Sequence, residues 1–445
     1  MPVPGNYGNL LTYKSAGFTH YTMTEDLYPL TNADGELGTA DDGVINADYM
    51  NVLNWCADER VGLKAMIRNF RNDPQYFIND DDSVRYMDPP NNKISYNIPV
   101  RTITNELTEY AAVDGYYMAD EPSWTKIGTL GPLVDWYNRY GGNTLFHVNL
   151  NPSYGTDMLE GHTYQEYVDY FCDSILSKVN GPKTLSTDYY PLMKKTTFWF
   201  SEEKYIDSNF LSDYFILAHK VKELNASVKN ESDKVQLNLY IDANSLNNGK
   251  NRDVTTKADI RFMTNCAVAF GAKSLNYYGY TGSDGKGLVN VVEGVYTPTK
   301  LYKDVQETNA ELQSLADAVL NFDWVGTRVY RGEESGDQYN EEAFAKIKGK
   351  VLSRFRYITD VNCTYDTIIS EMKDSENNKG YMVVNYSEPS QNLTDSVSLT
   401  FEDQIQKAII YHNGEKKVEN VENNALTLNL AAGEGAFVYP VYAAQ

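Results

Sequence analysis

Short apolar segments alternate with longer amphipathic ones from residue 18 to residue 320, and this alternation limits the possible fold more than any other feature. The short segments have the length of strands and the longer ones have helical periodicity, a pattern typical of parallel βαβ units. The predicted strands are Phe18–Thr24, Leu63–Arg68, Gly115–Asp120, Thr144–Asn149, Thr184–Tyr189, Val235–Ile241 and Ser274–Tyr280. The predicted helices are Tyr49–Arg60, Ile103–Ala112, Leu130–Tyr140, Tyr164–Leu176, Phe210–Asn225, Lys257–Phe270 and Pro298–Leu320.

These segments supply one strand fewer than a closed barrel of eight parallel strands requires. The missing strand should precede Phe18, where a Gly/Pro-rich segment and Leu10–Lys14 are all that remain. A doubly wound sheet is the alternative, but no Gly-rich phosphate loop follows the first strands. We therefore predict an α/β fold, a (β/α)8 TIM barrel whose first strand is abbreviated or missing.

After Leu320 the helical periodicity stops, and strands separated by turn signals follow. Asn413-Gly414 is a dipeptide typical of a tight turn between strands. The spacing predicts an antiparallel β-sandwich, so the 445 residues divide into a catalytic barrel at 1–322 and a β-sandwich domain at 323–445. The strands predicted there are Trp324–Arg331, Val351–Tyr357, Thr367–Met372, Tyr381–Tyr386, Val397–Phe401, Lys407–His412, Leu426–Leu430 and Ala436–Val441.

Composition excludes several classes of partner. A formal charge of −22 argues against nucleic acid and anionic membranes, and no apolar run is long enough to span a bilayer. The opening Met-Pro-Val-Pro-Gly is compatible with a start placed after a removed signal, so we expect a secreted, cell-surface or periplasmic protein. The sequence gives no indication of the oligomeric state.

The four cysteines, Cys56, Cys172, Cys266 and Cys363, are scattered without CxxC or CxxH spacing. The first three fall within helical patterns, which favours buried free thiols over a zinc site or a disulfide framework. We accordingly predict neither a metal site nor a cofactor.

The run Gly115–Pro122 (Gly-Tyr-Tyr-Met-Ala-Asp-Glu-Pro) is the strongest indication of chemistry. It begins as an aromatic strand and ends on two adjacent acids, Asp120 and Glu121, where proline stops the ladder. Acids at the carboxyl end of a parallel strand lie where a barrel carries its active site. The competing interpretation is an acidic surface turn in which Asp120 caps the next helix.

Polar and aromatic residues also occupy the ends of the other predicted strands. A structural sheet gains nothing from polar groups that converge on one edge, whereas a site for a polyhydroxylated ligand does. The substrate-binding residues predicted on this basis are His20, Tyr21, Arg68, Asp120, Asn149, Asn151, Tyr189, Tyr278 and Tyr280. Trp199 joins them because it lies in an aromatic run after the sixth predicted strand, where it could fold over the cleft or merely anchor the loop.

Glycosidic cleavage uses a pair of carboxyl groups, one to protonate the leaving oxygen and one to attack or to activate water. Glu121 is the predicted proton donor, because a nearby ring such as Tyr117 or Trp124 would desolvate it and raise its pKa. Asp242 and Asp188 are the candidates for the second carboxylate. Each has a structural alternative, since Asp188 could orient a neighbouring side chain and Asp242 could cap a turn with Asn244.

The motif around Glu121 resembles the Asp-Glu-Pro strand of bacterial glycoside hydrolases related to the β-galactosidase type of (β/α)8 barrel. Asn149-Leu150-Asn151-Pro152 is similar to their fifth strand and its loop, and Ser186–Pro191 (Ser-Thr-Asp-Tyr-Tyr-Pro) to their sixth. The resemblance covers about residues 15–330 and implies that Glu121 matches the acid/base glutamate of the larger retaining clan. That clan usually has Asn before this glutamate and a nucleophilic Glu on strand seven, whereas this chain has Asp120 and Asp242.

The function expected from these observations is hydrolysis of O-glycosidic bonds in oligo- or polysaccharides by a bacterial enzyme, with carbohydrate as the partner. One rival is a carbohydrate-binding protein on a barrel that has lost its nucleophile. Another is a barrel enzyme acting on other bonds, such as a lyase or deacetylase, which would need a metal cluster or a Lys/His base. The sugar, the linkage and the retaining or inverting outcome are left open by the sequence.

Overall fold

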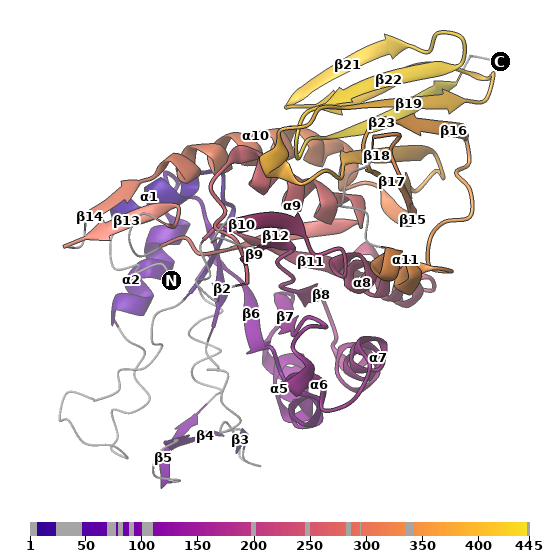
Figure 1. Cartoon of the computed structure of the whole chain (residues 1–445). Coiled ribbons are helices and arrows are strands. Elements are labelled where there is room, and N and C mark those ends of the chain that lie inside the picture. The colour runs from indigo at the N-terminus through magenta and orange to yellow at the C-terminus, as the bar shows by residue number, and fades with distance from the viewer. Residues whose placement is uncertain are drawn as a thin grey trace. The chain divides into compact units, whose positions relative to one another are not determined.

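The computed structural model describes residues 7–23, 47–68, 77–78, 83–88, 93–99, 110–196, 202–244, 250–281, 286–293, 295–334 and 341–442. The chain forms two compact units, each made of two stretches of sequence (Figure 1). The first unit holds residues 1–188 and 224–236, and the second holds residues 189–223 and 237–445. Each unit is treated separately below.

The first unit is built on five parallel strands that follow one another in the order β1-β2-β6-β7-β8. Their bounds are β1 His20–Thr22, β2 Lys64–Ile67, β6 Val113–Asp120, β7 Leu145–Leu150 and β8 Lys183–Thr187. The helices of this unit are α1 Tyr7–Ser15, α2 Ala47–Ala57, α4 Trp124–Ile127, α5 Gly131–Tyr140, α6 Thr156–Leu159 and α7 Tyr164–Ser174. A small antiparallel sheet contains β3 Phe77–Ile78, β4 Ser83–Asp88 and β5 Lys93–Pro99.

Aromatic packing holds helix α5 against strands β6 and β7. The Trp136 ring meets Tyr116 edge-on at 5.3 Å, and Tyr137 meets Phe146 at 5.1 Å. All four side chains are nearly inaccessible to water. Burying rings of this size is among the largest apolar contributions that single residues make, so this packing fixes the strands whose carboxyl ends carry the acids.

The second unit contains the parallel strands β11 Val235–Asp242 and β12 Ala272–Tyr278, with helices α8 Phe210–Asn225, α9 Lys257–Ala269 and α10 Lys300–Val319. Two antiparallel hairpins accompany them, β9 Leu192–Thr196 with β10 Glu202–Ile206, and β13 Val289–Val292 with β14 Val295–Pro298. Among the described residues, the parallel strands of the chain number seven and alternate with helices along the sequence.

The predicted TIM-barrel architecture is confirmed, and each of the seven predicted strands overlaps an observed one. Within residues 7–23, the segment ahead of β1 is helix α1 and not a strand. The predicted helix at 103–112 lies mostly outside the described residues. Neither hairpin was predicted. The strands of the first are short and largely polar, since Leu192–Thr196 includes two lysines and Glu202–Ile206 begins with two glutamates. The strands of the second have four residues each.

The predicted antiparallel sandwich is also confirmed. One sheet has the order β15-β17-β18-β23-β20-β21 and the other the order β16-β19-β22. Side chains from both sheets, among them Ile369, Val383, Leu399 and Leu428, form one buried core. The strands are β15 Asp323–Tyr330, β16 Ile358–Cys363, β17 Thr367–Lys373, β18 Lys379–Asn385, β19 Asp395–Phe401, β20 Ile405–His412, β21 Glu415–Asn420, β22 Ala425–Leu430 and β23 Gly435–Tyr442, and helix α11 spans Glu341–Ile347.

The structure differs from the prediction in strands β16 and β21, helix α11 and the segment 351–357. Residues 351–357 do not form a strand, because side chains take up main-chain groups that a ladder would use: the Arg356 N–H donates to Glu371 and the Tyr357 N–H to the Tyr381 hydroxyl. Strand β21 was not predicted at all. Each of its residues is exposed, so it shows no apolar alternation, and its charges suit an edge strand.

Helix α9 packs directly against the sandwich within the second unit. The Asn265 amide donates to the carbonyl of Gly433 at 3.0 Å, and the Phe262 and Tyr386 rings stack at 6.0 Å. Gly433 has a φ of +73°, and a Cβ there would lie 2.1 Å from the Ala258 carbonyl oxygen. The turn therefore needs glycine for both its conformation and its approach to the helix.

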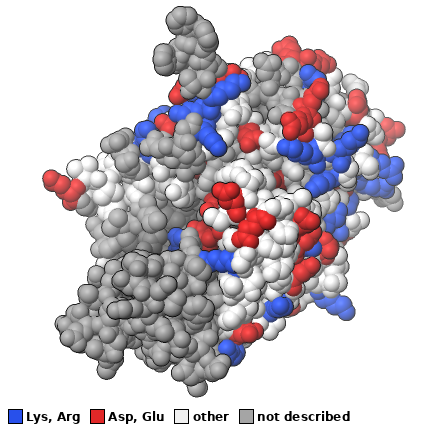
Figure 2. Space-filling view, turned by 60° about the horizontal axis from the view of Figure 1, so that its bottom comes forward, with Lys and Arg blue, Asp and Glu red and all other residues white. Residues whose placement is uncertain are grey.

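Other sequence expectations concern cysteines and charge. All four cysteines are buried and free, as predicted. No helix in the described part of the chain has both the length and the apolarity needed to cross a membrane. On the face shown in Figure 2, acidic and basic side chains are interspersed over the described residues.

Candidate active site

The carboxyl end of β6 has an irregular backbone. The register against β7 shifts between Tyr117 and Ala119, and the ladder continues one residue past the strand because the Glu121 N–H donates to the Asn149 carbonyl at 2.8 Å. Glu121 has a φ of 44°, in the left-handed region that non-glycine residues rarely occupy. Bulges and strained residues of this kind are concentrated at functional sites.

Asp120 is fixed by three side chains from three strand segments. Arg68, which directly follows β2, pairs with Oδ2 at 3.1 Å. The Tyr117 hydroxyl donates to Oδ1 at 2.7 Å and the Asn149 amide donates to the same oxygen at 3.2 Å. The Arg68 guanidinium also lies 5.0 Å from the Tyr117 ring centre, and the Ser186 hydroxyl orients the Asn149 amide at 3.1 Å. Asp120 is thus an ion-paired carboxylate with little freedom to move.

The carboxyl groups of Glu121 and Asp188 affect each other's ionisation, and the charge of Asp120 acts on both. Burial raises the pKa of Glu121, the negative charge of Asp120 raises it further, and a hydrogen bond with Asp188 opposes this rise. Burial also holds the pKa of Asp188 well above its ordinary value, and the charges of Glu121 and Asp120 add to the effect. Oδ1 of Asp188 is enclosed and makes no hydrogen bond within the described structure. Because the negative charge of Glu121 raises the pKa of Asp188, the two carboxyl groups do not readily ionise together.

Histidine does not supply the acid–base group at this edge. His147, in the middle of β7, is fully buried, bonds to the Thr184 hydroxyl at 2.7 Å and packs 4.9 Å from the Tyr117 ring. Burial lowers the pKa of His147 to about 4, so the ring is neutral at physiological pH. It is a packing residue behind Tyr117.

The first unit therefore brings together five of the predicted site residues: Arg68, Asp120, Glu121, Asn149 and Asp188. It does not bring the other three to this group. His20 begins β1 and bonds to Asp114 near the start of β6, at the amino ends of the strands. Tyr21 is buried in the core against Tyr13. Asn151 is buried in the turn after β7, where its amide donates to the carbonyls of Pro152 and Gly155.

Asp242 and Tyr278 belong to the second unit, at the paired ends of β11 and β12. Asp242 is 2% exposed, accepts the Asn244 N–H at 2.9 Å, and has its pKa raised to about 8 by burial. This hydrogen bond matches the alternative in which Asp242 caps a turn with Asn244. Tyr278 is 46% exposed, and its ring lies 5.9 Å from that of Tyr190.

The remaining predicted aromatic residues contribute less open surface. Tyr189 is 1% exposed, and its hydroxyl donates to Asp207 at 2.7 Å. Tyr280 is 4% exposed. Trp199 lies outside the described residues. Of the rings expected to desolvate Glu121, Tyr117 instead bonds to Asp120, and Trp124 stacks on His162 at 3.6 Å.

Sequence reasoning missed three contributors to the first unit's site. Ser186 orients Asn149, and Tyr167 bridges two loops through its hydroxyl, which donates to the Pro122 carbonyl and accepts the Asn151 N–H at 3.4 Å. Tyr154, in the turn after β7, is half exposed near Asp188. The sequence Asn-Pro-Ser-Tyr-Gly marks a turn, but no pattern in it indicates which way the tyrosine faces.

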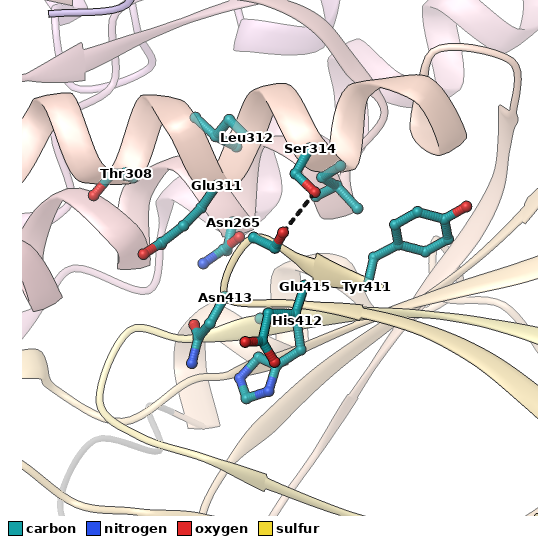
Figure 3. A pocket seen from close by; sticks show the side chains of 12 residues that line it. Asn265, Thr308, Glu311, Leu312, Ser314, Tyr411, His412, Asn413 and Glu415 are labelled. Atoms are coloured by element: carbon teal, nitrogen blue, oxygen red, sulfur yellow. Dashed lines mark hydrogen bonds between the residues drawn. The ribbon is translucent and has the colours of Figure 1, made fainter. Parts of the chain in front are cut away.

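The structure also contains a small polar pocket in the second unit, between α10 and the turn from β20 to β21 (Figure 3). Its ionisable groups already have ionic partners: Glu311 pairs with Arg261 and Lys257, and His412 with Glu434. Ser314 donates to the Gly414 carbonyl across it at 2.9 Å. The described residues contain no group of three or more His, Cys, Asp or Glu arranged to hold a metal ion.

No family model matches the chain, and no curated protein matches it. Among solved structures, one named "Glycoside hydrolase" aligns with 99% of this chain and 90% of its own at 10% identity and a TM-score of 0.53. A family 27 β-L-arabinopyranosidase from Geobacillus stearothermophilus, bound to arabinose, aligns with 99% and 92% at 13% identity and 0.43. A family 51 arabinofuranosidase from Xanthomonas axonopodis pv. citri aligns with 97% and 89% at 10% identity and 0.44.

The TM-score of 0.53 indicates a shared fold, and at 10% identity the likeness is one of fold alone. The chain shares its fold with that solved structure: parallel strands that alternate with helices, followed by antiparallel sheets. Fold alone does not define the reaction, which must be argued from the site.

Proposed function

We propose that the protein is a glycoside hydrolase that cleaves O-glycosidic bonds of oligo- or polysaccharides, with Glu121 as the general acid. The observation that carries the proposal is the acidic group at the carboxyl ends of β6, β7 and β8. There Asp120 is held by Arg68, and burial together with neighbouring carboxylates raises the pKa of both Glu121 and Asp188. The resemblance of the Asp-Glu-Pro strand to β-galactosidase-like barrels supports the same role.

The electrostatics suit a proton donor. A general acid must keep its proton near the working pH and release it as the leaving oxygen gains charge. Burial and the Asp120 carboxylate favour the protonated form of Glu121, and the Asp188 hydrogen bond favours the carboxylate that remains after transfer. Asp188 thereby stabilises the conjugate base of the acid.

Asp188 and Asp242 are the two candidates for the second catalytic carboxylate. Paired carboxyls of glycosidases stand about 5–5.5 Å apart in retaining enzymes and roughly 6.5–9.5 Å apart in inverting ones. Asp188 is buried, which holds its pKa well above the ordinary value and disfavours its ionised form, so we assign it to supporting Glu121. Asp242 remains the candidate nucleophile or base, although a pKa of about 8 disfavours its ionised form at neutral pH.

The raised pKa of Asp242 favours a second candidate function. In this alternative the protein binds carbohydrate on a barrel that has no working nucleophile. Both functions place the sugar at the strand ends and need no cofactor. We further propose that the barrel occupies residues 1–322, that the sandwich from 323 supports it, and that the protein is exported.

Hydrolysis of a panel of aryl glycosides and unactivated oligosaccharides tests the proposal. The wild type should turn over at least one of them, and Glu121→Gln should lower kcat/KM for an unactivated substrate by roughly 10²–10⁴-fold. The loss should be smaller for an aryl glycoside, whose leaving group needs less protonation.

Glu59→Gln, at an exposed glutamate of the same unit, is the matched control and should leave turnover unchanged. A wild type that binds oligosaccharide without hydrolysing any substrate would favour the binding protein. Normal hydrolysis of an unactivated substrate by Glu121→Gln would refute the assignment of the acid.

A further inference from the structure

We infer that Tyr154 is the aromatic platform on which a sugar ring of the substrate stacks beside the Glu121–Asp188 pair, an inference that rests on the proposed function. Tyr154 lies in the turn after β7, and its side chain is 52% exposed. Its hydroxyl reaches the main-chain carbonyl of Asp188 at 3.5 Å. The hydroxyl of Tyr154 therefore lies next to the main chain of the segment that carries Asp188.

The distribution of exposed apolar side chains singles out this turn. Among the described residues of the first unit, the large apolar side chains that are exposed are Tyr154 and Met158, at 52% and 41%. Both lie between β7 and α7, on the segment that continues from Asn149. Of the other tyrosines near the acids, Tyr117 is bonded to Asp120 and Tyr167 is buried.

The turn that carries Tyr154 is rigid and tied to the segment after Glu121. The buried Asn151 amide donates to the carbonyls of Pro152 and Gly155 at 2.9 and 3.0 Å, so it spans the turn. A Cβ on Gly155 would lie 2.0 Å from that amide nitrogen, which leaves no room for another residue.

Tyr167 makes the connection to the acid. Its hydroxyl donates to the Pro122 carbonyl and accepts the Asn151 N–H. The loop after β6 and the loop after β7 thus share one buried hydroxyl, and the position of Tyr154 is set relative to Glu121. A platform held in this way loses little conformational freedom when a ligand stacks on it.

The chemistry matches one class of ligand. A tyrosine ring offers a flat apolar face to the C–H face of a sugar ring, while nearby carboxyl and amide groups can bond its hydroxyls. The 3.5 Å contact of the hydroxyl is at the long end of hydrogen-bond geometry. The face of the ring, more than its hydroxyl, is therefore what the substrate uses.

The test compares Tyr154→Ala, Tyr154→Leu and Tyr154→Phe with wild type, using the best aryl glycoside of the panel. Loss of the ring should raise KM roughly tenfold with kcat changed far less, because stacking binds substrate and transition state alike. Phe should behave like wild type. Tyr154→Leu keeps apolar surface but has no flat ring, so its KM should resemble that of Tyr154→Ala. It also serves as a second variant in case Tyr154→Ala does not fold.

Tyr442→Ala, at an exposed tyrosine of the sandwich, is the control and should not alter KM. The same series in a Glu121→Gln background, titrated calorimetrically with an unactivated oligosaccharide, measures binding without turnover. If the proposed function is wrong, the wild type will hydrolyse none of the substrates. The calorimetric titrations would then still show whether Tyr154 binds oligosaccharide. An unchanged KM and Kd in folded Ala and Leu variants, or no oligosaccharide binding by any variant, would overturn the inference.

Discussion

Asp120 determines the charge environment of Glu121, the residue that follows it. Its carboxylate is fixed by Arg68, Tyr117 and Asn149, so its negative charge cannot move away when Glu121 ionises. A glutamate beside such a fixed negative charge holds its proton to higher pH than one beside a neutral amide.

Asp120→Asn tests this tuning. The charge of Asp120 raises the pKa of Glu121, so its removal should lower that pKa, and the Arg68 charge left without its partner should lower it further. The alkaline limb of the kcat/KM profile, which reports the general acid of the free enzyme, should therefore move to lower pH. An alkaline limb that stays in place or moves upward would contradict the argument.

Asp242 allows a separate prediction about stability. Its folded pKa of about 8 lies above the value of about 4 expected in the unfolded chain, so the folded state binds its proton more tightly. The stability that it contributes is complete below about pH 4 and is lost as the pH rises from about 4 to about 8.

Asp242→Asn removes this titration and should increase the free energy of unfolding at pH 8, relative to pH 5, by on the order of a few kcal/mol compared with wild type. Denaturant unfolding at the two pH values measures the difference. Parallel pH dependences in the two proteins would show that Asp242 ionises normally. Loss of hydrolysis in the stabilised variant would independently identify Asp242 as the second carboxylate.

At the scale of elements, the interior of the second unit contains a buried ionic bridge. Arg252, 2% exposed, lies between Asp259 and Glu388, which are almost completely buried. Asp259 belongs to the capping box that begins α9, and Glu388 accepts the Ser390 N–H after β18. One guanidinium therefore connects a barrel helix with the sandwich.

Arg252→Met should destabilise the protein by roughly 3–5 kcal/mol, because it leaves two buried carboxylates without a cation. Thermal or denaturant unfolding measures this loss. Arg60→Met, at an arginine whose side chain is 74% exposed in its pair with Asp58, is the control and should unfold almost like wild type. Equal effects of the two substitutions would mean that the bridge contributes no more than a surface pair.

Elements with a periodic apolar face were predictable from the sequence, and those without one were not. The parallel strands β6, β7 and β8 are buried along most of their length, which the sequence shows as short apolar runs, and α9 has a helical apolar pattern. Strand β21 has no buried residue and hairpin β9–β10 is largely polar, so neither leaves a pattern to recognise.

The candidate site shows the same division. Asp120, Glu121 and Asp188 could be chosen because chemistry-bearing residues follow apolar strands. The contact between Glu121 and Asp188 and the exposure of Tyr154 depend on a bulge, a positive φ and a turn held by Asn151, none of which has a periodic signature. His20 was misplaced because β1 begins at that residue and does not end near it.

For the whole molecule, the acids of the sandwich have structural roles in the described residues. Glu434 pairs with Arg261 of α9 and with His412, and its hydrogen bonds lower its pKa to about 2. Asp395 accepts the N–H groups of Thr364 and Tyr365. These contacts agree with a sandwich that stabilises the protein and supplies no catalytic group.

Truncation after residue 322 should therefore yield a chain that fails to fold cooperatively, because α9 loses the surface against which it packs. Circular dichroism and a melting curve would report this, with the full chain as reference. A truncated chain that melts cooperatively and retains hydrolysis would show that the barrel is independent of the sandwich.

The approach of Gly433 to the Ala258 carbonyl has a consequence for how such proteins can diversify. Many enzymes acquire new specificity by exchanging accessory modules through linkers, which requires that the seam between the parts tolerate unfamiliar side chains. Here the β domain meets helix α9 through the turn at Gly433, where there is no space for one extra carbon atom. A recombinant that imports a foreign β domain would have to import the matching helix with it, so inheritance should keep the two as a single block.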